Sequence, residues 1–389
     1  MTAANVTSIA RVRAAARNKA ALLQSNNRIA TALLVIVVVL IVIGLGATQS
    51  ASSAVGIDQA QDRFYFFKRQ LLGVGIGTVA LLITARINYR HYRKLAIPSF
   101  LITLGLLVAV LATGTVRGGA RRWLEVPFVS SFQPSEVAKV AVVFTLAFIL
   151  ERKHKLLANL GHFLVPVLVV VGSVGVLVMR QPDLGTMIVI AAAAMAVILA
   201  SDAPLRYVAL LAVAGIAAAS MLAFSDEYRV DRIVGFLDPW GNAQEEGYQV
   251  IQGYYALSNG GIFGVGLGAS RARWFYLPNA HTDFIFAIIG EETGLIGAFT
   301  VIGLFVALGI TGWVVATRAP DRFGRMIAVG ITAWLSFQAL VNVGGVLGLL
   351  PITGIALPFV SFGSTALIVS MAALGVMVNI ARNGVQGTA

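Results

Sequence analysis

Apolar runs long enough to cross a membrane recur along almost the whole chain, and they limit the fold more than any other feature. Most of them approach the roughly 20 residues that a spanning helix needs. Only 12% of the 389 residues are charged, whereas a soluble domain carries about 25%. The runs lie at residues 28–49, 70–86, 97–115, 136–150, 162–180, 184–200, 205–223, 284–316, 325–348 and 360–381. The sequence therefore predicts an all-α integral membrane protein with about ten transmembrane helices.

Three of the runs depart from a plain lipid-facing anchor. The runs at 136–150 and 184–200 are short, and each begins beside polar residues. That pattern is typical of helices that face a cavity inside a bundle. The run at 284–316 is longer than one crossing requires, so we expect it to tilt or to protrude from the bilayer.

Basic residues set the expected orientation, because cytoplasmic loops carry an excess of Lys and Arg. With ten spans, most of the basic residues fall on one side: Arg11, Arg13, Arg17, Lys19, Arg28, Arg86, Arg90, Arg93, Lys94, Arg152, Lys153, Lys155, Arg206, Arg318, Arg322, Arg325 and Arg382. Both termini are then cytoplasmic. The expected organisation is a basic tail at 1–27, a single membrane domain at 28–383 and a short cytoplasmic tail at 384–389.

Composition excludes several functions. The net charge of +12 comes from short clusters between apolar runs, which fits membrane topology and not a nucleic-acid-binding stripe. The chain contains no cysteine, so disulfides and thiolate chemistry are excluded. Its four histidines do not have the spacing of a zinc-binding helix.

One connection, residues 224–283 between the seventh and eighth runs, is much longer than the others. It is rich in aromatic residues and glycine, and its aromatic content argues against disorder. Residues 246–258 have helical periodicity, which predicts an amphipathic or re-entrant helix at the outer surface. The glycine-rich stretch at 260–268 follows no strand, so a dinucleotide-binding loop is excluded by context. This loop is therefore expected to be partly helical and functional.

Asp283 is the first candidate for chemistry. It lies at the outer end of the eighth run, where two interpretations are open. An Asp or Thr before an apolar helix often caps its first turn. Alternatively, an ionised carboxylate at the membrane boundary can accept a proton from a sugar hydroxyl. The nearby His281 either tunes that carboxylate or serves as a hydrogen-bonding residue.

Glu136, Lys139 and Asp183 form a second group near the outer ends of two runs. Glu136 and Lys139 are three residues apart, which places both on one helical face. Lys139 is expected to lie between Glu136 and Asp183. The group is either a structural ion-pair cluster or part of a substrate cavity, since ionisable residues inside a membrane are usually functional.

Two further groups combine polar residues with glycine or tryptophan. Arg117, Arg121, Arg122 and Trp123 lie on the outer face, where the arginines could hold a pyrophosphate and the tryptophan could stack on a sugar. The alternative is an interfacial tryptophan beside snorkelling arginines. In the segment before the last run, Ser361, Ser364 and Thr365 could bind substrate or could cap the last helix.

The chain resembles the SEDS family (shape, elongation, division and sporulation proteins) over nearly its whole length. The resemblance lies in seven motifs that occur in the order of the family: GARRWL, QPSEVAK, QPDLGT, DPW, GYQVIQ, YLPNAHTDFIFAIIGEETG and LPITGIALPFVSFG. The FYFFKRQL segment after the first run and the segment around Asp283 look more like the division branch than the elongation branch.

The resemblance implies a peptidoglycan glycosyltransferase that polymerises lipid II at the outer face of the bacterial cytoplasmic membrane. It assigns catalysis to Asp283. It also implies that the polar members of the motifs bind substrate, namely Arg121, Arg122, Trp123, Gln133, Ser135, Glu136, Lys139, Gln181, Asp183, Gln249, His281, Thr282, Ser361 and Ser364. The implied partners are lipid II, a class B penicillin-binding protein, and regulators of division or elongation. No cofactor is required, although a divalent cation (Mg²⁺ or Mn²⁺) remains open.

Two departures and two alternatives accompany this interpretation. Gly363 stands alone where many family members have two glycines, and Asn279 stands where many have Glu. A lipid II flippase would use the same cavity charges but form no bond. A non-catalytic scaffold for a penicillin-binding protein would depend on its helix surfaces and not on its cavity.

Overall fold

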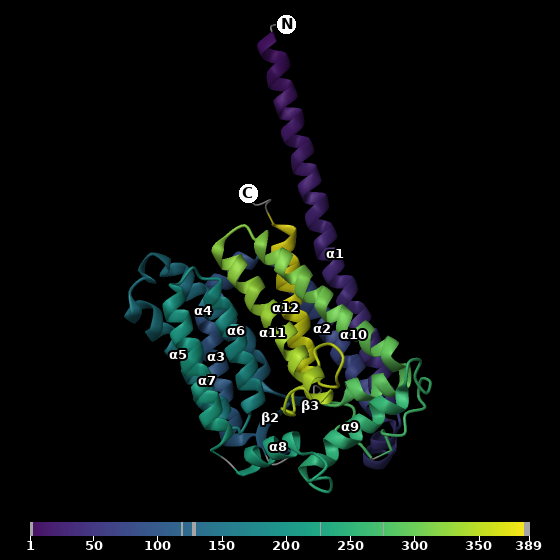
Figure 1. Ribbon diagram of the computed structural model, residues 1–389. Coiled ribbons are helices and arrows are strands. Elements are labelled where there is room, and N and C mark those ends of the chain that lie inside the picture. The colour runs from purple at the N-terminus through teal and green to yellow at the C-terminus, as the bar shows by residue number, and fades with distance from the viewer. Residues whose placement is uncertain (1–2, 118–119, 127–129, 226, 275, 385–389) are drawn as a thin grey trace.

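The computed structural model describes residues 3–117, 120–126, 130–225, 227–274 and 276–384, and these are mostly helical (Figure 1). The helices are α1 (Ala3–Ala60), α2 (Tyr65–Arg86), α3 (Tyr92–Thr113), α4 (Pro134–Arg152), α5 (Leu160–Met179), α6 (Leu184–Leu199), α7 (Leu205–Ala223), α8 (Glu227–Leu237), α9 (Glu246–Gly260), α10 (Ile285–Thr317), α11 (Arg322–Val346) and α12 (Ser364–Arg382). Two short 3₁₀ helices, Tyr89–His91 and His154–Leu156, complete the helical elements. Local sequence fixes several starts: Asn159, Asp183 and Asp321 cap α5, α6 and α11 through their side chains.

Eight of the described helices are long and apolar enough to cross a membrane: α1 from Gln24, α2, α3 with its preceding 3₁₀ turn, α5, α7, α10, α11 and α12. They coincide with eight of the ten apolar runs. The other two runs form α4 and α6. Helix α6 has only 16 residues, and α4 carries Glu136, Lys139, Glu151 and Arg152. Both pack within the bundle against α11, so the prediction that these helices line an interior fits their position.

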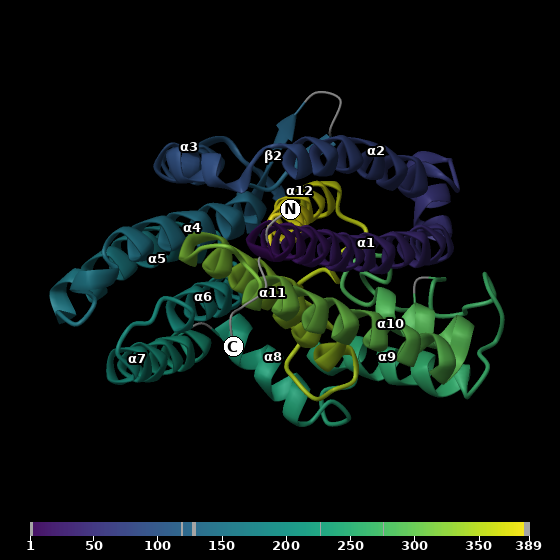
Figure 2. The same ribbon diagram turned by 90° about the horizontal axis from the view of Figure 1, so that it is seen from above.

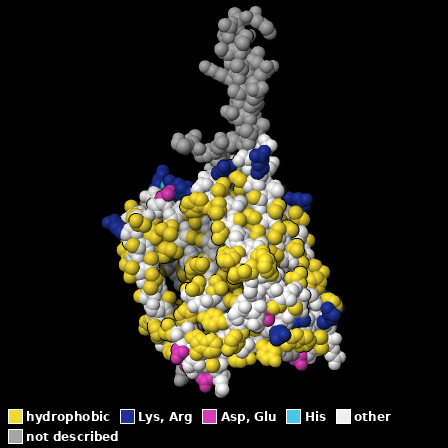
Figure 3. Space-filling model, turned by 45° about the vertical axis from the view of Figure 1, so that its right-hand side comes forward, with side chains coloured by type: hydrophobic (Ala, Val, Ile, Leu, Met, Phe, Trp, Pro, Cys, Tyr) yellow, Lys and Arg dark blue, Asp and Glu magenta, His cyan; other side chains and the backbone are white. Residues whose placement is uncertain are grey.

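Helices α11 and α12 form the most buried part of the bundle (Figure 2). Helix α12 packs closely along α2, where a side chain at Gly375 would collide with the Leu81 carbonyl. At this contact between the two helices, the Thr84 hydroxyl on α2 donates to the Ala372 carbonyl on α12 at 2.8 Å. Helix α7 lies at the edge and buries little of its surface. Apolar side chains cover most of the face beside α10, and charged side chains gather toward its two ends (Figure 3).

The two described ends of the chain lie at the same end of the bundle, which we name the termini end. The opposite end, the loop end, carries α8, α9 and three antiparallel strands (Figure 1). These strands are β1 (Thr115–Arg117), β2 (Ala120–Val126) and β3 (Ser130–Phe132), in the order β1-β2-β3. The sequence did not predict them, because β1 and β3 have only three residues each and β2 (ARRWLEV) does not alternate regularly between apolar and polar residues.

Three other features refine the expectations. The predicted helix at 246–258 is confirmed as α9, whereas α8 was not anticipated. Helix α1 is continuous from Ala3, so residues 3–27 of the expected tail are helical. The long run at 284–316 forms α10, which is interrupted at Gly294, where φ is 66°. A positive φ is favourable for glycine, which explains the residue type at this break.

Candidate active site

Asp283 lies directly before α10, at the loop end of the bundle. Helix α10 begins at Ile285, and its N-cap is Phe284, without a side-chain hydrogen bond. The cap interpretation of Asp283 is therefore wrong. The preceding turn depends on Asn279, whose φ is 53° and whose carbonyl accepts from the Thr282 amide at 3.0 Å. Asparagine tolerates this left-handed conformation better than glutamate does, which gives a reason for Asn at this position.

The main chain around Asp283 is held by groups from distant parts of the sequence. The Asn342 side chain on α11 donates to the Asp283 carbonyl at 2.8 Å and to the Ile355 carbonyl at 2.7 Å. The Ser361 hydroxyl donates to the Thr282 carbonyl at 2.6 Å. These bonds link the residues before α10 to α11 and to the segment that precedes α12. The carboxylate is thus carried on a fixed backbone, as catalytic groups require.

The surroundings of Asp283 raise its pKa to about 6, and burial is the largest cause. Arg232, Thr282 and Arg122 act in the opposite direction, and Asp183 raises the pKa further. The residue is nevertheless partly exposed, so it is not sealed inside the bundle. A carboxylate with a pKa near neutrality is suited to accept and release protons at physiological pH.

The space next to this carboxylate is bounded by Gly354, whose φ is 72°. A Cβ atom at Gly354 would lie 3.5 Å from the Asp283 Oδ2 and 3.9 Å from the Arg232 Nη1. The Arg232 Nη1 also donates to the Ile352 carbonyl at 3.5 Å. Asp283 and Arg232 thus face the same small recess, and α8 contributes a cation to the site.

Arg122 on strand β2 and Asp183 at the start of α6 form the part of the site that precedes α10 in the sequence. The Arg122 Nε donates to the Gln181 carbonyl at 2.9 Å, and the Arg122 Nη1 lies 3.7 Å from the Asp183 Oδ1. The Gln133 amide bridges Ser135 Oγ at 3.0 Å and Asp183 Oδ2 at 3.4 Å. Five of the candidate residues are thus brought together, and two of them, Arg122 and Asp183, act electrostatically on Asp283.

Arg121 and Trp123 are placed differently. Neighbouring residues of a strand point to opposite faces, so Arg121 and Arg122 on β2 diverge. The Arg121 Nη1 donates to the Leu111 and Ala112 carbonyls at the end of α3, at 3.4 Å each. Trp123 pairs with Thr115 across the strands and is half-buried. The side chain of Arg117, the other arginine of this group, lies outside the described residues.

Glu136 and Lys139 form a buried ion pair, with 2.8 Å between Lys139 Nζ and Glu136 Oε1. Lys139 also donates to Gln338 Oε1 at 2.9 Å, and Trp334 Nε1 donates to the same oxygen at 2.8 Å. The expectation that Lys139 lies between Glu136 and Asp183 is wrong, because Asp183 pairs with Arg122 and caps α6. A capping carboxylate is directed at its own helix start, away from Lys139.

The remaining candidate residues hold the segments that surround the site. The His281 ring packs against Phe66, with 4.7 Å between ring centroids, and against Phe362 at 5.7 Å. Burial lowers the pKa of His281 to about 4, so it is neutral at physiological pH. Phe362, which precedes Gly363, thus contributes an aromatic ring that packs against His281 and Phe66. The Gln249 amide on α9 donates to the Pro278 carbonyl at 3.1 Å.

Ser361, Ser364 and Thr365 also have defined positions. The Ser361 hydroxyl is buried and accepts from the Leu357 amide at 2.8 Å. The Thr365 hydroxyl donates to the Ser131 carbonyl at 3.0 Å, which attaches α12 to β3. Ser364 is the first residue of α12, whose N-cap Gly363 makes no side-chain hydrogen bond. The interpretation of these hydroxyls as caps is wrong.

Sequence reasoning missed two residues that shape the site, Gln338 and Asn342. Arg232 carried a signal, because an arginine on the outer face is an exception to the topology rule. Gln338 and Asn342 lie four residues apart inside an apolar run, and polar residues at such positions usually face a bundle interior.

Several buried polar atoms at the site have no hydrogen-bond partner within the described residues: Glu136 Oε2, Gln181 Nε2, Gln181 Oε1 and Asn342 Oδ1. Such groups are costly to bury unless a ligand or water satisfies them. Among the residues that the structure describes, no cluster of three His, Cys, Asp or Glu side chains could hold a metal ion. Asp183 and Asp283 could hold a divalent cation only together with substrate oxygens.

A family model described as "Cell cycle protein", which covers the FtsW, RodA and SpoVE proteins, matches residues 31–386. Stage V sporulation protein E of Bacillus subtilis (strain 168) is 40% identical over 352 residues, 90% of this chain and 96% of that protein. The probable peptidoglycan glycosyltransferase FtsW of Geobacter metallireducens is 37% identical over 368 residues, 94% of this chain and 98% of that protein.

Solved structures show the same fold. A chain of the structure described as "Structural coordination of polymerization and crosslinking by a peptidoglycan synthase complex" has a TM-score of 0.73 at 27% identity. The alignment covers 91% of this chain and 98% of that chain. The rod shape determining protein RodA of Thermus thermophilus has a TM-score of 0.65 at 26% identity, covering 91% and 97%.

Proposed function

The chain belongs to the SEDS family of FtsW, RodA and SpoVE proteins, and from this premise we propose that it is a peptidoglycan glycosyltransferase that polymerises lipid II into β-1,4-linked glycan strands. The observation that carries the proposal is Asp283, a partly exposed carboxylate whose pKa is raised to about 6 beside Arg232 and Arg122. A base with two cations near it suits a reaction that removes a proton and releases a pyrophosphate.

We place the loop end outside the cell and both termini in the cytoplasm, with α4 and α6 completing ten crossings. The basic residues of the connections at the termini end support this orientation. The lipid chains of the substrate would then lie between helices, and its sugars would lie at the outer surface. Asp283, directly before α10, is at the boundary between the two.

In the proposed mechanism Asp283 accepts the proton of the acceptor GlcNAc 4-hydroxyl. The oxygen attacks the anomeric carbon of the donor MurNAc from the face opposite the leaving group, and the bond from that carbon to the pyrophosphate breaks. The inverted centre gives a β-1,4 linkage. Asp283 then returns its proton to solvent, and the site is ready for another cycle.

Arg122 and Arg232 are the proposed partners of the departing undecaprenyl pyrophosphate, because both act on Asp283 electrostatically and lie beside the recess. Arg121 is not assigned this role, because its guanidinium is directed at the end of α3. A divalent cation held by substrate oxygens and Asp183 would supply further positive charge to the leaving group.

The expected partner is a class B penicillin-binding protein, which would cross-link the new strands. Its support is the likeness to a chain of a peptidoglycan synthase complex. Division is the proposed context, because the similar relatives include FtsW proteins. Sporulation is an alternative because stage V sporulation protein E is also similar, and elongation is another because the fold is shared with RodA.

The decisive experiment is polymerisation of labelled lipid II by the purified protein in proteoliposomes, with and without a cognate class B penicillin-binding protein. Asp283→Asn removes the proposed base. Asp58→Asn is the matched control, because Asp58 is an exposed carboxylate at the end of α1. We expect glycan ladders from the wild type and from Asp58→Asn, and none from Asp283→Asn at equal folded amounts.

Ladders from Asp283→Asn would remove Asp283 as the essential base. No ladder from any variant, even with the partner present, would reject the polymerase. In that case lipid II translocation in the same proteoliposomes would separate a flippase from a scaffold.

A further inference from the structure

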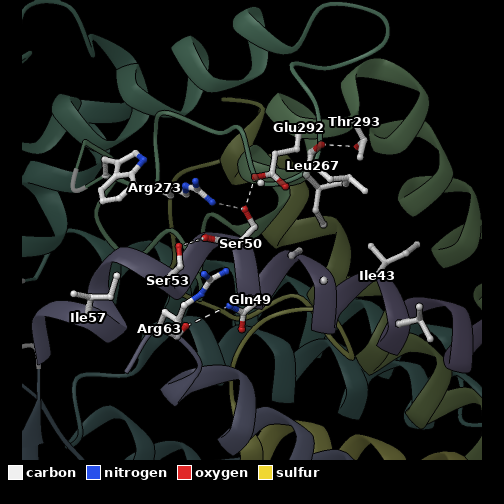
Figure 4. Close-up of a pocket in the computed structure, with 16 residues that line it drawn as sticks. Ile43, Gln49, Ser50, Ser53, Ile57, Arg63, Leu267, Arg273, Glu292 and Thr293 are labelled. Carbon is white, nitrogen blue, oxygen red and sulfur yellow. Dashed lines mark hydrogen bonds between the residues drawn. The ribbon is translucent and has the colours of Figure 1, made fainter. Parts of the chain in front are cut away.

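A second cavity, of about 640 Å³, lies between α1, the 267–274 segment and the part of α10 before its break (Figure 4). Asp283 and the residues of its recess are not among those that line it. Val42 and Leu267 of its lining are exposed, so the cavity opens to the surface of the protein. The proposed glycosyl transfer uses no residue of this cavity.

The lining changes from apolar to polar along α1. Val42, Ile43 and Ala47 come first, Gln49, Ser50 and Ser53 follow toward the loop end, and the apolar Ile57 is the last α1 residue of the lining. Val42 is 62% exposed, so the apolar part opens toward lipid. A cavity that is apolar at membrane depth and polar at the surface matches an amphiphile with its chain inward and its headgroup outward.

Two arginines stand at the polar part of the cavity. Arg63 follows α1, and Arg273 lies in the opposite wall (Figure 4). The Arg273 Nη1 donates to Ser50 Oγ at 3.3 Å, and its Nε is buried without a partner among the residues described. Arg63 is exposed, with its guanidinium carbon 4.8 Å from the Phe64 ring centroid. Both guanidinium groups therefore keep donors for an anion, and arginine suits phosphate because it donates in pairs.

The acidic residue in the cavity is already hydrogen-bonded to the protein through one of its oxygens. Glu292 Oε1 accepts from the Ser50 hydroxyl and from the Ser270 amide at 3.4 Å. Two arginines against one carboxylate leave a formal excess of positive charge. Gln49 Oε1 is buried without a hydrogen-bond partner in the described ranges, and as an acceptor it can receive a hydroxyl hydrogen.

The wall that carries Arg273 is fixed to the break in α10 by main-chain bonds. The Val265 amide donates to the Glu291 carbonyl at 3.0 Å, and the Gly266 amide donates to the Glu292 carbonyl at 3.1 Å. In the other direction the Leu295 amide donates to the Gly261 carbonyl at 3.0 Å. The glycine-rich stretch 260–268 thus acts as a brace, and the cavity is already formed before a ligand binds.

We propose that this cavity binds an anionic lipid, with the phosphate between Arg63 and Arg273 and the first part of the chain against Val42, Ile43 and Ala47. A headgroup hydroxyl would donate to Gln49 Oε1. Two sources supply this chemistry, an acidic glycerophospholipid and a polyprenyl phosphate. The site lies apart from Asp283, so lipid binding here is independent of glycosyl transfer and is measured without lipid II.

The test is native mass spectrometry of the full-length protein, titrated with phosphatidylglycerol, undecaprenyl phosphate or zwitterionic phosphatidylcholine. The double variant Arg63→Gln/Arg273→Gln removes the phosphate donors. Lys68→Gln is the charge control, because Lys68 is exposed, pairs with Asp62 and does not line the cavity. We expect wild type and Lys68→Gln to retain an anionic lipid. The double variant should bind this lipid with an affinity lower by about tenfold or more.

A second variant tests the chain-binding part without changing charge. Gly46 lines the cavity, and a Cβ atom there would meet nothing within 4 Å, so Gly46→Leu fills the space without a clash. Gly75→Leu is the control, because Gly75 has equally open surroundings on α2 and lies outside the cavity lining. We expect Gly46→Leu to weaken anionic lipid binding and Gly75→Leu to leave it unchanged.

The anionic lipid that is retained in the titration identifies the source, phospholipid or polyprenyl phosphate. Equal retention of phosphatidylcholine would overturn the proposal, as would anionic lipid binding that survives the double arginine variant. Loss in the arginine variant with full binding by Gly46→Leu would replace the lipid site by a headgroup-only site, which inorganic phosphate would then occupy equally well.

Discussion

The Asn342 side chain holds the main chain of Asp283, 59 residues earlier in the sequence, through a hydrogen bond of 2.8 Å. The same amide nitrogen reaches the Ile355 carbonyl at 2.7 Å. One side chain of α11 therefore sets the distance between the proposed base and the segment that carries Gly354. Asn342 is a positioning residue, because it acts on the carboxylate only through the backbone.

Asn342→Leu is expected to lower kcat about 100-fold, because small misplacements of a catalytic group have effects of this size. The KM for lipid II should change little. Asn379→Leu is the control, since Asn379 is a buried amide at the termini end that donates to the Ala85 carbonyl at 2.9 Å. Both variants should lower Tm, and only Asn342→Leu should lower kcat below the unfolding temperature. Equal kcat values in the two variants would show that the effect is one of stability alone.

The rate of polymerisation should depend on pH through Asp283. Its pKa is raised to about 6, so the carboxylate is protonated below pH 6 and cannot accept the substrate proton. We expect kcat/KM to rise about tenfold per pH unit below pH 6 and to level off above it. His281→Phe should keep the same midpoint, because a pKa of about 4 leaves His281 neutral throughout this range. A midpoint near 3.8, the ordinary value for Asp, would argue against burial as the cause.

Two adjacent arginines offer a matched test of the pyrophosphate site. Arg122 is directed at Gln181 and Asp183, whereas Arg121 is directed at the end of α3. Arg122→Gln should lower kcat/KM by roughly 10- to 100-fold, the effect of losing one charged hydrogen bond to the leaving group. Arg121→Gln should stay within about twofold. The glycan ladder assay measures both, and a larger loss in Arg121→Gln would reverse the assignment.

Gly354→Ala should inactivate the enzyme without unfolding it. The new methyl group would lie 3.5 Å from the Asp283 Oδ2, in the space that the acceptor hydroxyl needs. Gly354 also has a φ of 72°, which an alanine adopts only with strain. Gly261→Ala controls for that strain, because its φ is 52° and nothing lies within 4 Å of its Cβ position. We expect the rate of lipid II polymerisation to fall about 100-fold in Gly354→Ala and to stay nearly normal in Gly261→Ala.

Lys139→Met should destabilise the bundle by roughly 3 to 5 kcal/mol, because it leaves Glu136 as a buried charge without its counterion. Lys139 is completely buried and 2.8 Å from Glu136. The double variant Glu136→Gln/Lys139→Met should recover much of this loss. Thermal unfolding of all three proteins measures the effect, and a double variant as unstable as Lys139→Met would exclude the unpaired charge as the cause.

The apolar runs were enough to predict the membrane helices, because burial in lipid selects residue type directly at every position. Helix α9 was predictable from its periodicity, because its apolar residues recur along one packed side of the helix. Asp283 could be found because a single acidic residue beside an apolar run is conspicuous. Whether it capped the helix or stayed available could not be decided, because that depends on one turn of backbone around Asn279.

The parts of the site that were missed depend on contacts between distant segments. Arg121 and Arg122 are equivalent in sequence, and only the strand β2 separates their directions. Lys139 pairs with Gln338, 199 residues away, which no local pattern reveals. Arg232 reaches the recess because α8 lies across the loop end. Such pairings are set by tertiary packing and not by residue spacing.

The break in α10 at Gly294 divides this helix into two parts, and the glycine-rich brace is bonded to both: to Glu291 and Glu292 before the break and to Leu295 after it. The first part follows directly on Asp283, and the second exposes Leu295, Ile296 and Phe299 on its surface. Bilayers differ in hydrophobic thickness, and spanning helices adjust by tilting. Because the brace bonds to both parts, the lipid-exposed part cannot tilt at Gly294 without straining the bond from the Leu295 amide to the Gly261 carbonyl. The inclination of α10 in the bilayer is thus tied to the segment that follows Asp283.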